Sequence, residues 1–391
     1  MSGLKLNDKK TGLWIGANSG KDRISTPERN FKWPKYKVKA LGVWFSNDPE
    51  ATATLNYNEK LDKVQNVLSC WQYHRLTLIG KITVRESLVA SQLVYVLSPL
   101  LTNVKLIKEV NKLFYSFLWN GKGDKIINDY SNGGLKLIDI QSFSKSLKAT
   151  WIKKYLEEEN QGKWKYFFDL EQEGHGGSIA LTSNLKKKDI IENLNIKNCF
   201  MKETLSIWAE VNFDDHIMSE KQFLVQILWH NSLMRIENSP IFYQEWFDRG
   251  IMKVTHLKNA SNSFLSLAEM QRKYRLNFCP LKYFGLIFAL KSLWNKCEDD
   301  CINNCNYENY VEKLTKCQSS NKLVYAKLVS TKCTPAIYQQ KWLKDCHLND
   351  VDSINWWDAY QLASKYTKSA LHEFLNSSTS FCIDEKQQII S

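Results

Sequence analysis

Lysines and aromatic residues alternate along residues 31–39, whose sequence is "FKWPKYKVK". Rings or apolar groups stand at Phe31, Trp33, Tyr36 and Val38, and cations stand at Lys32, Lys35, Lys37 and Lys39. Flat rings can stack on nucleobases while neighbouring ammonium groups neutralise phosphates. An edge strand that keeps lysines on its solvated face to prevent aggregation has the same pattern. The segment is therefore either a nucleic-acid contact or a protected sheet edge.

A second basic set lies within residues 59–86, between apolar positions that have helical spacing. Its cations are Lys60, Lys63, His74, Arg75, Lys81 and Arg85, and its acids are Glu59, Asp62 and Glu86. Polar residues between the buried positions of a helix are expected on its solvated face. We therefore predict an exposed basic surface that binds nucleic acid through Lys35, Lys37, Lys60, Lys63, Arg75, Lys81 and Arg85.

The distribution of charge supports a polyanionic partner. The chain has 391 residues and a formal net charge of +12. Residues 1–154 hold 25 Lys and Arg against 12 Asp and Glu, whereas residues 155–391 hold 28 against 29. The excess of positive charge therefore lies in the first two-fifths of the chain, and nucleic acid is the commonest partner of such a block. A merely soluble, lysine-rich surface is the alternative.

Four cysteines form the clearest candidate for a metal site. Cys297, Cys301 and Cys305 are spaced by four residues, and Cys317 follows. Thiolates on one side of a helix could bind zinc, but "CEDDCINNC" has no partner knuckle and no nearby histidine. We expect incidental thiols and no metal site. The sequence also contains no HExxH motif, no phosphate-binding glycine loop and no recognisable Ser-His-Asp arrangement.

Composition favours a helical intracellular protein of two or three domains. The chain has only 16 Gly and 7 Pro, which disfavours a loop-rich or β-sandwich scaffold. Its ten cysteines are irregularly spaced, and the polar first ten residues do not resemble a secretory signal. Reduced thiols in the cytoplasm or nucleus are therefore expected. The uncharged run at residues 87–104 fits a buried core helix better than a membrane span.

Apolar residues recur every three or four positions in three successive segments, which predicts three helices. The positions are Leu61, Val64, Leu68 and Trp71; Leu78, Ile82, Val89, Leu93 and Val96; and Ile107, Val110, Phe114, Phe117 and Leu118. A short apolar strand, "ALGVWFS" at residues 40–46, is predicted before them. The sequence thus predicts a mainly α chain with a small β element near the N-terminus.

The later part of the chain is also predicted to be mostly helical. Residues 135–140 read as a short strand, and a helix follows with Phe143, Leu147, Trp151 and Tyr155 on one face. The acidic, glycine-bearing residues 157–183 read as a linker or surface loop. Helical patterns resume at residues 185–211 and 220–233.

Several of these segments resemble the reverse transcriptase of LINE-type (non-LTR) retrotransposons. The strand "ALGVWFS" resembles the family's primer-grip strand, and "LTLIGKI" and "FLWNGK" follow it in the family's order and spacing. "GGLKLIDIQSFSKSLKATW" at residues 133–151 is similar to the segment just after the family's thumb. The resemblance implies a palm remnant over residues 1–48, a helical thumb over 49–126, a post-thumb strand and helix over 127–160, and a mostly helical C-terminal region over 161–391.

The resemblance also implies where polymerase chemistry would be. In the family, a pair of carboxylates on a hairpin holds the catalytic metal and precedes the element in which Lys10 lies. The only Asp-Asp pairs here, Asp214-Asp215 and Asp299-Asp300, follow the thumb. The chain is thus expected to begin after the catalytic strand and to hold no cofactor, with Mg²⁺ expected only for the intact polymerase. Lys10 corresponds to a palm lysine near the incoming nucleotide, or is a solvated lysine in a turn.

By this resemblance the chain is a C-terminal fragment of an RNA-directed DNA polymerase. It is expected to keep template–primer binding parts, to lack the catalytic aspartates and to be inactive alone. Its expected partners are RNA, an RNA–DNA hybrid or a DNA duplex, with no membrane. The alternative is a decayed or repurposed helical protein-interaction module without nucleic-acid binding. An incomplete gene model of an intact polymerase is a third interpretation, and the oligomeric state is not predicted.

Overall fold

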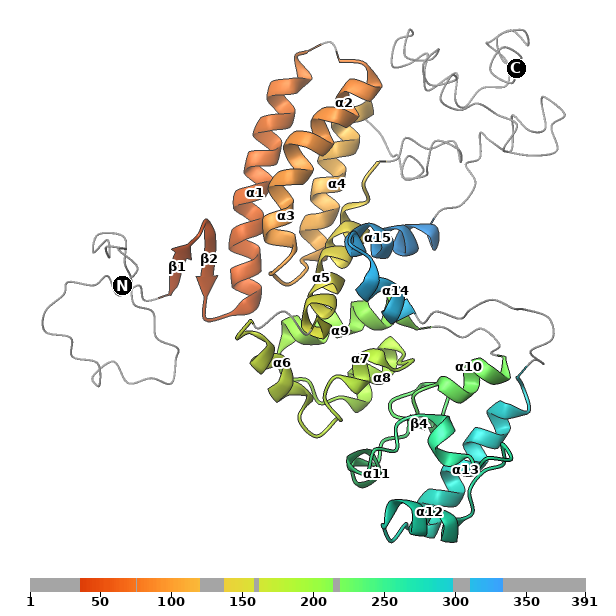
Figure 1. Ribbon diagram of the computed structural model, residues 1–391. Coiled ribbons are helices and arrows are strands. Elements are labelled where there is room, and N and C mark those ends of the chain that lie inside the picture. Colours follow the sequence, from red (N-terminus) through yellow and green to blue (C-terminus); the bar gives the residue numbers. More distant parts are fainter. Residues whose placement is uncertain are drawn as a thin grey trace, which may run out of the picture. The chain divides into compact units, whose positions relative to one another are not determined.

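The computed structural model describes residues 36–74, 76–119, 137–157, 162–213, 219–297 and 310–332. These residues belong to two compact units, one made of Met1–Ser144 with Val329–Ser391 and the other of Lys145–Leu328. The described part is mostly helical, with a two-stranded antiparallel sheet near its start (Figure 1). The predicted fold class, mainly α with a small β element near the N-terminus, is confirmed. The four-part division at residues 48, 126 and 160 stays a prediction.

The sheet near the start of the first unit is a β-hairpin. β1 spans Lys37–Ala40 and β2 spans Val43–Ser46. Leu41 and Gly42 connect the strands with φ angles of 49° and 80°. Two successive positive φ angles are what a tight two-residue hairpin turn requires, and glycine adopts them without strain. The prediction of one strand over residues 40–46 is therefore wrong at Leu41 and Gly42, because this turn separates Ala40 of β1 from β2.

Helix α1, Pro49–Gln72, follows the hairpin directly. The carboxylate of Asp48 caps it by accepting hydrogen bonds from the backbone N–H groups of Glu50 and Ala51, each at 3.1 Å. Pro49 suits the first position of a helix because it has no N–H group and its φ is already helical. The buried residues of α1 are Thr52, Ala53, Asn56, Tyr57, Val64 and Leu68. Two of these are polar side chains that contact the hairpin.

The other two predicted helices complete a bundle with α1. The second contains α2 (Leu78–Val84), the π-helical turn η2 (Arg85–Ala90) and α3 (Ser91–Leu97) in direct succession, and the third is α4 (Val104–Trp119). Helix α1 contacts both α3 and α4 (Figure 1). The buried positions include Ile82, Val89, Leu93, Val96, Ile107, Val110, Phe114, Phe117 and Leu118. The three predicted helices are therefore confirmed, although their pattern did not indicate the π turn.

The uncharged run at residues 87–104 contributes to the core of this bundle. Leu93, Val96 and Leu97 are at most 2% exposed. The interpretation of this run as a core helix is confirmed for residues 87–97, whereas residues 98–103 connect α3 to α4 outside any helix. In the part of the chain that the structure describes, no helix has both the length and the apolar character needed to cross a bilayer.

Helix α5, Ile140–Leu156, begins where a strand was predicted. The Asp139 carboxylate accepts hydrogen bonds from the backbone N–H of Ser142 at 3.0 Å and from its hydroxyl at 2.6 Å. A cap of this kind satisfies a helix N–H group that has no intrahelical partner. The predicted strand is therefore wrong for residues 137–140, and residues 135 and 136 lie outside the described residues. The predicted helix over residues 143–155 is confirmed.

The second unit contains the rest of α5 and two hydrophobic cores. The first core is built from α5 and from α6 (Lys165–Gln172), α7 (Ile179–Thr182), α8 (Lys187–Asn193), α9 (Cys199–Asn212), α14 (Tyr310–Lys316) and α15 (Ser320–Ser330). The linker or surface loop predicted over residues 157–183 is therefore wrong for α6 and α7, whereas residues 173–178 between them form turns. Phe168 and Leu181 are buried in the core, which keeps α6 and α7 helical despite the glycines between them. The helix predicted over residues 185–211 is two helices, α8 and α9.

The second core of this unit is rich in aromatic residues. It is built from α10 (Glu220–Val225), β3 (Arg235–Ile236), β4 (Ser239–Pro240), α11 (Gln244–Asp248), the 3₁₀ turn η5 (Val254–Leu257), α12 (Leu267–Tyr274) and α13 (Pro280–Trp294). The helix predicted over residues 220–233 ends at Val225. Trp229 then enters the core, where its indole N–H donates to the carbonyl of Ile251 at 2.5 Å. This tertiary contact replaces the helix that local spacing favoured.

Candidate nucleic-acid interface

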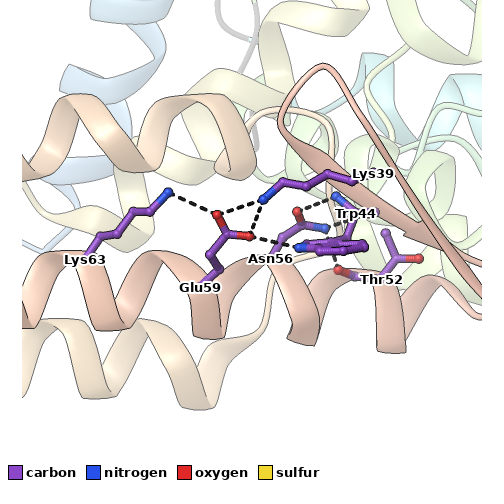
Figure 2. Close-up of polar contacts among 6 residues, drawn as sticks. All are labelled: Lys39, Trp44, Thr52, Asn56, Glu59 and Lys63. Atoms are coloured by element: carbon purple, nitrogen blue, oxygen red, sulfur yellow. Dashed lines mark hydrogen bonds and ion pairs between the residues drawn. The ribbon is translucent and has the colours of Figure 1, made fainter. Parts of the chain in front are cut away.

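One face of α1 holds the hairpin through polar side chains (Figure 2). The face consists of Thr52, Asn56, Glu59 and Lys63, spaced four, three and four residues apart. The Asn56 side chain accepts a hydrogen bond from the backbone N–H of Trp44 at 2.8 Å and donates to its carbonyl at 2.7 Å. The Thr52 hydroxyl accepts from the N–H of Ser46 at 2.8 Å. These side chains satisfy the outer edge of β2 as a third strand would.

Glu59 gathers three donors from the hairpin and from its own helix. The ammonium of Lys39 lies 2.7 and 3.0 Å from its two oxygens, and that of Lys63 lies 3.0 Å away. The indole N–H of Trp44 donates to the same carboxylate at 2.8 Å. The hydrogen bonds from Lys39, and then those from Lys63 and Trp44, lower the pKa of Glu59 from 4.5 to about 2. Glu59 is therefore ionised throughout the physiological pH range.

This pKa shift predicts how the stability that Glu59 contributes depends on pH. We expect Glu59→Gln to lower the free energy of unfolding by about 1 kcal/mol near neutral pH, the scale of a partly exposed ion pair. Because the folded pKa lies below the unfolded one, this contribution is complete above 4.5 and is lost as the pH falls toward 2. Urea titrations of the wild type and the variant across this range measure it, with Asp62→Asn as the control. An energy difference that stays constant down to about pH 3 would contradict the expectation.

The hairpin carries two lysines, Lys37 and Lys39, on the same face as Trp44. Directly opposite residues of antiparallel strands share a face, and Lys39 lies opposite Trp44. The ammonium groups of Lys37 and Lys39 lie 4.9 and 5.1 Å from the Trp44 ring centroid. Tyr36, just before β1, is 79% exposed, whereas Phe45, at 39% exposure, follows Trp44 directly and lies on the opposite face of the hairpin. The face that carries Lys37, Lys39 and Trp44 is therefore chemically suited to phosphates and bases, and its lysines also suit a protected sheet edge.

Two further predicted contacts lie on α1, beside the hairpin. Lys63 is exposed, and Lys60 is partly exposed. Both project from the helix that carries Glu59, and Lys63 pairs with that carboxylate. The structure thus brings together Lys37 and Lys63 of the predicted binding residues and adds Lys39 to them, while Lys60 follows Glu59 on the same helix. We call Lys37, Lys39, Lys60 and Lys63, with Trp44, the hairpin surface.

Lys81 and Arg85 are not on an exposed face, which corrects the prediction for both. Lys81 is 7% exposed, and its ammonium donates to the carbonyl of Phe117 at 3.1 Å. Arg85 is 2% exposed, donates to the carbonyl of Ile138 at 2.7 Å and stacks 4.2 Å from the ring centroid of Phe114. A buried cation is tolerated when carbonyl oxygens and ring faces replace its water. Both side chains therefore hold the bundle together.

Several other predicted residues lie outside the described residues. They are Lys10, Lys35, Arg75, Cys301, Cys305, Asp214, Asp215, Asp299 and Asp300. Cys297 and Cys317 are described, and both are partly buried. Within the described ranges, no group of three or more His, Cys, Asp and Glu side chains could hold a metal ion.

Sequence reasoning missed the parts of the site that depend on pairing. Glu59 was counted only as an acid that offsets the basic residues, and Thr52 and Asn56 were not singled out. One signal was present, because polar residues at these two positions stand four residues apart in the first turns of a helix directly after a strand. Such residues are suited to hydrogen-bonding the free edge of that strand.

Comparison with known proteins gives one distant similarity. No family model matches the chain. The chain is similar to the Transposon TX1 uncharacterized 149 kDa protein of Xenopus laevis, with 22% identity over 222 residues. The matched region covers 54% of this chain and 17% of that protein, so the chain spans less than a fifth of the relative's length. A transposon protein is therefore among the relatives of this sequence.

Proposed function

We propose that the chain derives from a LINE-type retrotransposon and that its first unit binds a nucleic-acid duplex. The observation that carries this proposal is the gathering of Lys37, Lys39 and Trp44 on one face of the hairpin, with Lys63 of α1 bound to the same carboxylate as Lys39. The similarity to a transposon protein supports the origin. The resemblance of "ALGVWFS" and "FLWNGK" to the primer grip and thumb of a reverse transcriptase supports the binding role.

The binding we propose is directed at the backbone of the duplex. Lysine ammonium groups neutralise phosphates without reading sequence, and the partly exposed ring of Trp44 can contact sugars or terminal bases. An RNA–DNA hybrid, an RNA duplex and a DNA duplex are all suitable ligands. Polymerase activity with Mg²⁺ is proposed for the intact family protein and not for this chain alone.

Removing the exposed lysines tests this function directly. We expect the combined variant Lys37→Gln, Lys60→Gln and Lys63→Gln to bind a short RNA–DNA hybrid about tenfold more weakly at low salt. The slope of log affinity against log salt should become shallower by about 2 to 3, because each lost phosphate contact removes about 0.9. Fluorescence anisotropy with a labelled duplex at several salt concentrations measures both quantities.

The control must change the net charge equally without touching the hairpin surface. Lys105, Lys108 and Lys112 are all exposed on α4, so their combined replacement by glutamine provides a match in the same unit. We expect this control to weaken binding much less. Equal losses for both triple variants would show that overall charge alone drives binding, and unchanged affinity in the first variant would remove the proposed function.

A protein-interaction role is the second candidate, and one feature of the second unit favours it. Helix α13 buries Tyr283, Leu286 and Leu290 on one side, yet it exposes an apolar stripe on the other. The stripe consists of Leu281, Phe284 and Phe288, which are 84%, 60% and 78% exposed. Exposed apolar residues at this spacing are typical of helices that bind a partner. The second function would be supported if the chain does not bind duplexes at low salt but binds a partner protein through this stripe.

A further inference from the structure

We propose that Lys39 and Lys63 form a phosphate-binding site for the nucleic-acid backbone, in which the carboxylate of Glu59 occupies the phosphate position while no duplex is bound. This site rests on the proposed duplex binding, and it assigns to Glu59 the role of an internal competitor. It predicts that removing a single acid strengthens binding, which no count of basic residues would suggest.

The geometry around Glu59 is that of an anion site. Ammonium groups from β1 and α1 and an indole N–H from β2 converge on one carboxylate at distances of 2.7 to 3.0 Å. A phosphodiester also spreads one negative charge over two outer oxygens, and it accepts the same charge-assisted hydrogen bonds. The donors that hold Glu59 are therefore the donors that a backbone phosphate needs.

The site is accessible, and its present contacts can be exchanged. The side chains of Lys39 and Lys63 are 38% and 51% exposed, and that of Glu59 is 29% exposed. Partly exposed ion pairs contribute little to stability, whereas each phosphate bound by a duplex also releases counterions from the nucleic acid. Lysine is a flexible point charge, so both ammonium groups can turn to an arriving phosphate without movement of the backbone.

The hairpin does not depend on Glu59 alone for its position. Asn56 and Thr52 hold the backbone of β2, and they touch neither of the two lysines in the contacts described above. Protonation cannot release the lysines under ordinary conditions, since the pKa of Glu59 is about 2. Release therefore requires a competing anion, and this is the role that we assign to the phosphate.

The test compares Glu59→Gln with the wild type in binding a labelled RNA–DNA hybrid. We expect the variant to bind about threefold to tenfold more tightly and its salt slope to become steeper by about 1 to 2. The glutamine amide oxygen can still accept the Trp44 indole hydrogen bond, and circular dichroism verifies that the variant is folded. Asp62→Asn removes one charge from an exposed position on the same helix and should change affinity less than about twofold, as expected for an exposed surface charge.

The same Glu59→Gln change in a protein without the two lysines tests whether they are responsible for the effect. In a protein that carries Lys39→Gln and Lys63→Gln, the Glu59→Gln change should no longer increase affinity. Affinity that does not rise in Glu59→Gln, that rises equally in Asp62→Asn, or that still rises without the lysines would overturn the phosphate site.

These outcomes are distinguishable from failure of the proposed function. If the combined lysine variant binds duplex more weakly but Glu59→Gln binds it like the wild type, the proposed duplex binding is supported and the phosphate site is contradicted. If only Glu59→Gln binds duplex, the competitor role is supported in its strongest form. If neither the wild type nor Glu59→Gln binds duplex at low salt, both proposals are contradicted.

Discussion

Replacing Arg85 with alanine is expected to lower the free energy of unfolding of the first unit by about 3 kcal/mol or more. The side chain is 2% exposed, and it donates to the carbonyl of Ile138 at 2.7 Å. Its guanidinium also lies 4.2 Å from the ring centroid of Phe114. Truncation removes a charge-assisted donor from that carbonyl, ends a buried cation–π contact and leaves a cavity beside the ring. Urea denaturation followed by circular dichroism measures the loss.

Two comparisons make this result specific to the buried guanidinium. Arg85→Lys keeps the charge but loses the planar fork, so its cost should be intermediate. Lys108→Ala removes an exposed base from α4 and should change stability by less than about 0.5 kcal/mol. If Arg85→Ala is as mild as Lys108→Ala, Arg85 lies on the surface, as the sequence pattern predicted, and the packing described for η2 is wrong.

Glu203→Gln in the second unit is expected to lower the free energy of unfolding by about 3 kcal/mol, because it leaves a buried ammonium without its carboxylate partner. The Lys148 side chain is fully buried on α5, and its ammonium lies 2.7 Å from Glu203 of α9. Burial lowers the pKa of Lys148, and the charge of Glu203 opposes that shift. The pKa of Lys148 should therefore fall further in the variant.

The sign of the accompanying pH dependence follows from this shift. A lysine whose folded pKa lies below its unfolded value binds fewer protons when folded, so stability rises with pH across that interval. The loss of unfolding free energy caused by Glu203→Gln should therefore become smaller as the pH rises toward the ordinary lysine pKa of 10.5. A deficit that is independent of pH would indicate that lost packing, and not the unpaired charge, causes the destabilisation.

The same two helices supply a matched control for this prediction. Lys145 of α5 pairs with Glu210 of α9 at 2.5 Å, but these side chains are 20% and 36% exposed. We expect Glu210→Gln to cost no more than about 1 kcal/mol, because water solvates the lysine that remains. Equal losses of unfolding free energy in Glu203→Gln and Glu210→Gln would show that burial of Lys148 is not the cause of the destabilisation. Thermal or urea unfolding of both variants in parallel provides the comparison.

Local sequence was a good guide to the helices of the first unit. The spacing of Val64, Leu93 and Phe114 follows the helical repeat, and all three residues are buried. The Asp48-Pro49 pair marks the start of α1 by chemistry that acts within one turn. Signals of this kind can be recognised in the sequence alone because they depend only on residues three or four positions apart.

Prediction failed where a strong tertiary contact overrides a local preference. Residues 226–233 continue a helical pattern in the sequence. The helix nevertheless ends at Val225, and the indole N–H of Trp229 donates a hydrogen bond to the carbonyl of Ile251, 22 residues along the chain. The acidic segment before Ser183 has the composition of a linker, yet Phe168 and Leu181 are buried in a core. Burying a large apolar side chain outweighs the helix propensity of a few residues.

The sequence by itself determined the mainly helical class, the basic character of the first two-fifths of the chain, and the rings and lysines that precede α1. Only the tertiary structure decided which cations face water. It buries Lys81 and Arg85 against Phe117 and Phe114, and it joins Lys39 to Glu59 across 20 residues. The reason is physical: charge and periodicity are properties of a short segment, whereas solvation depends on partners that distant segments bring into contact.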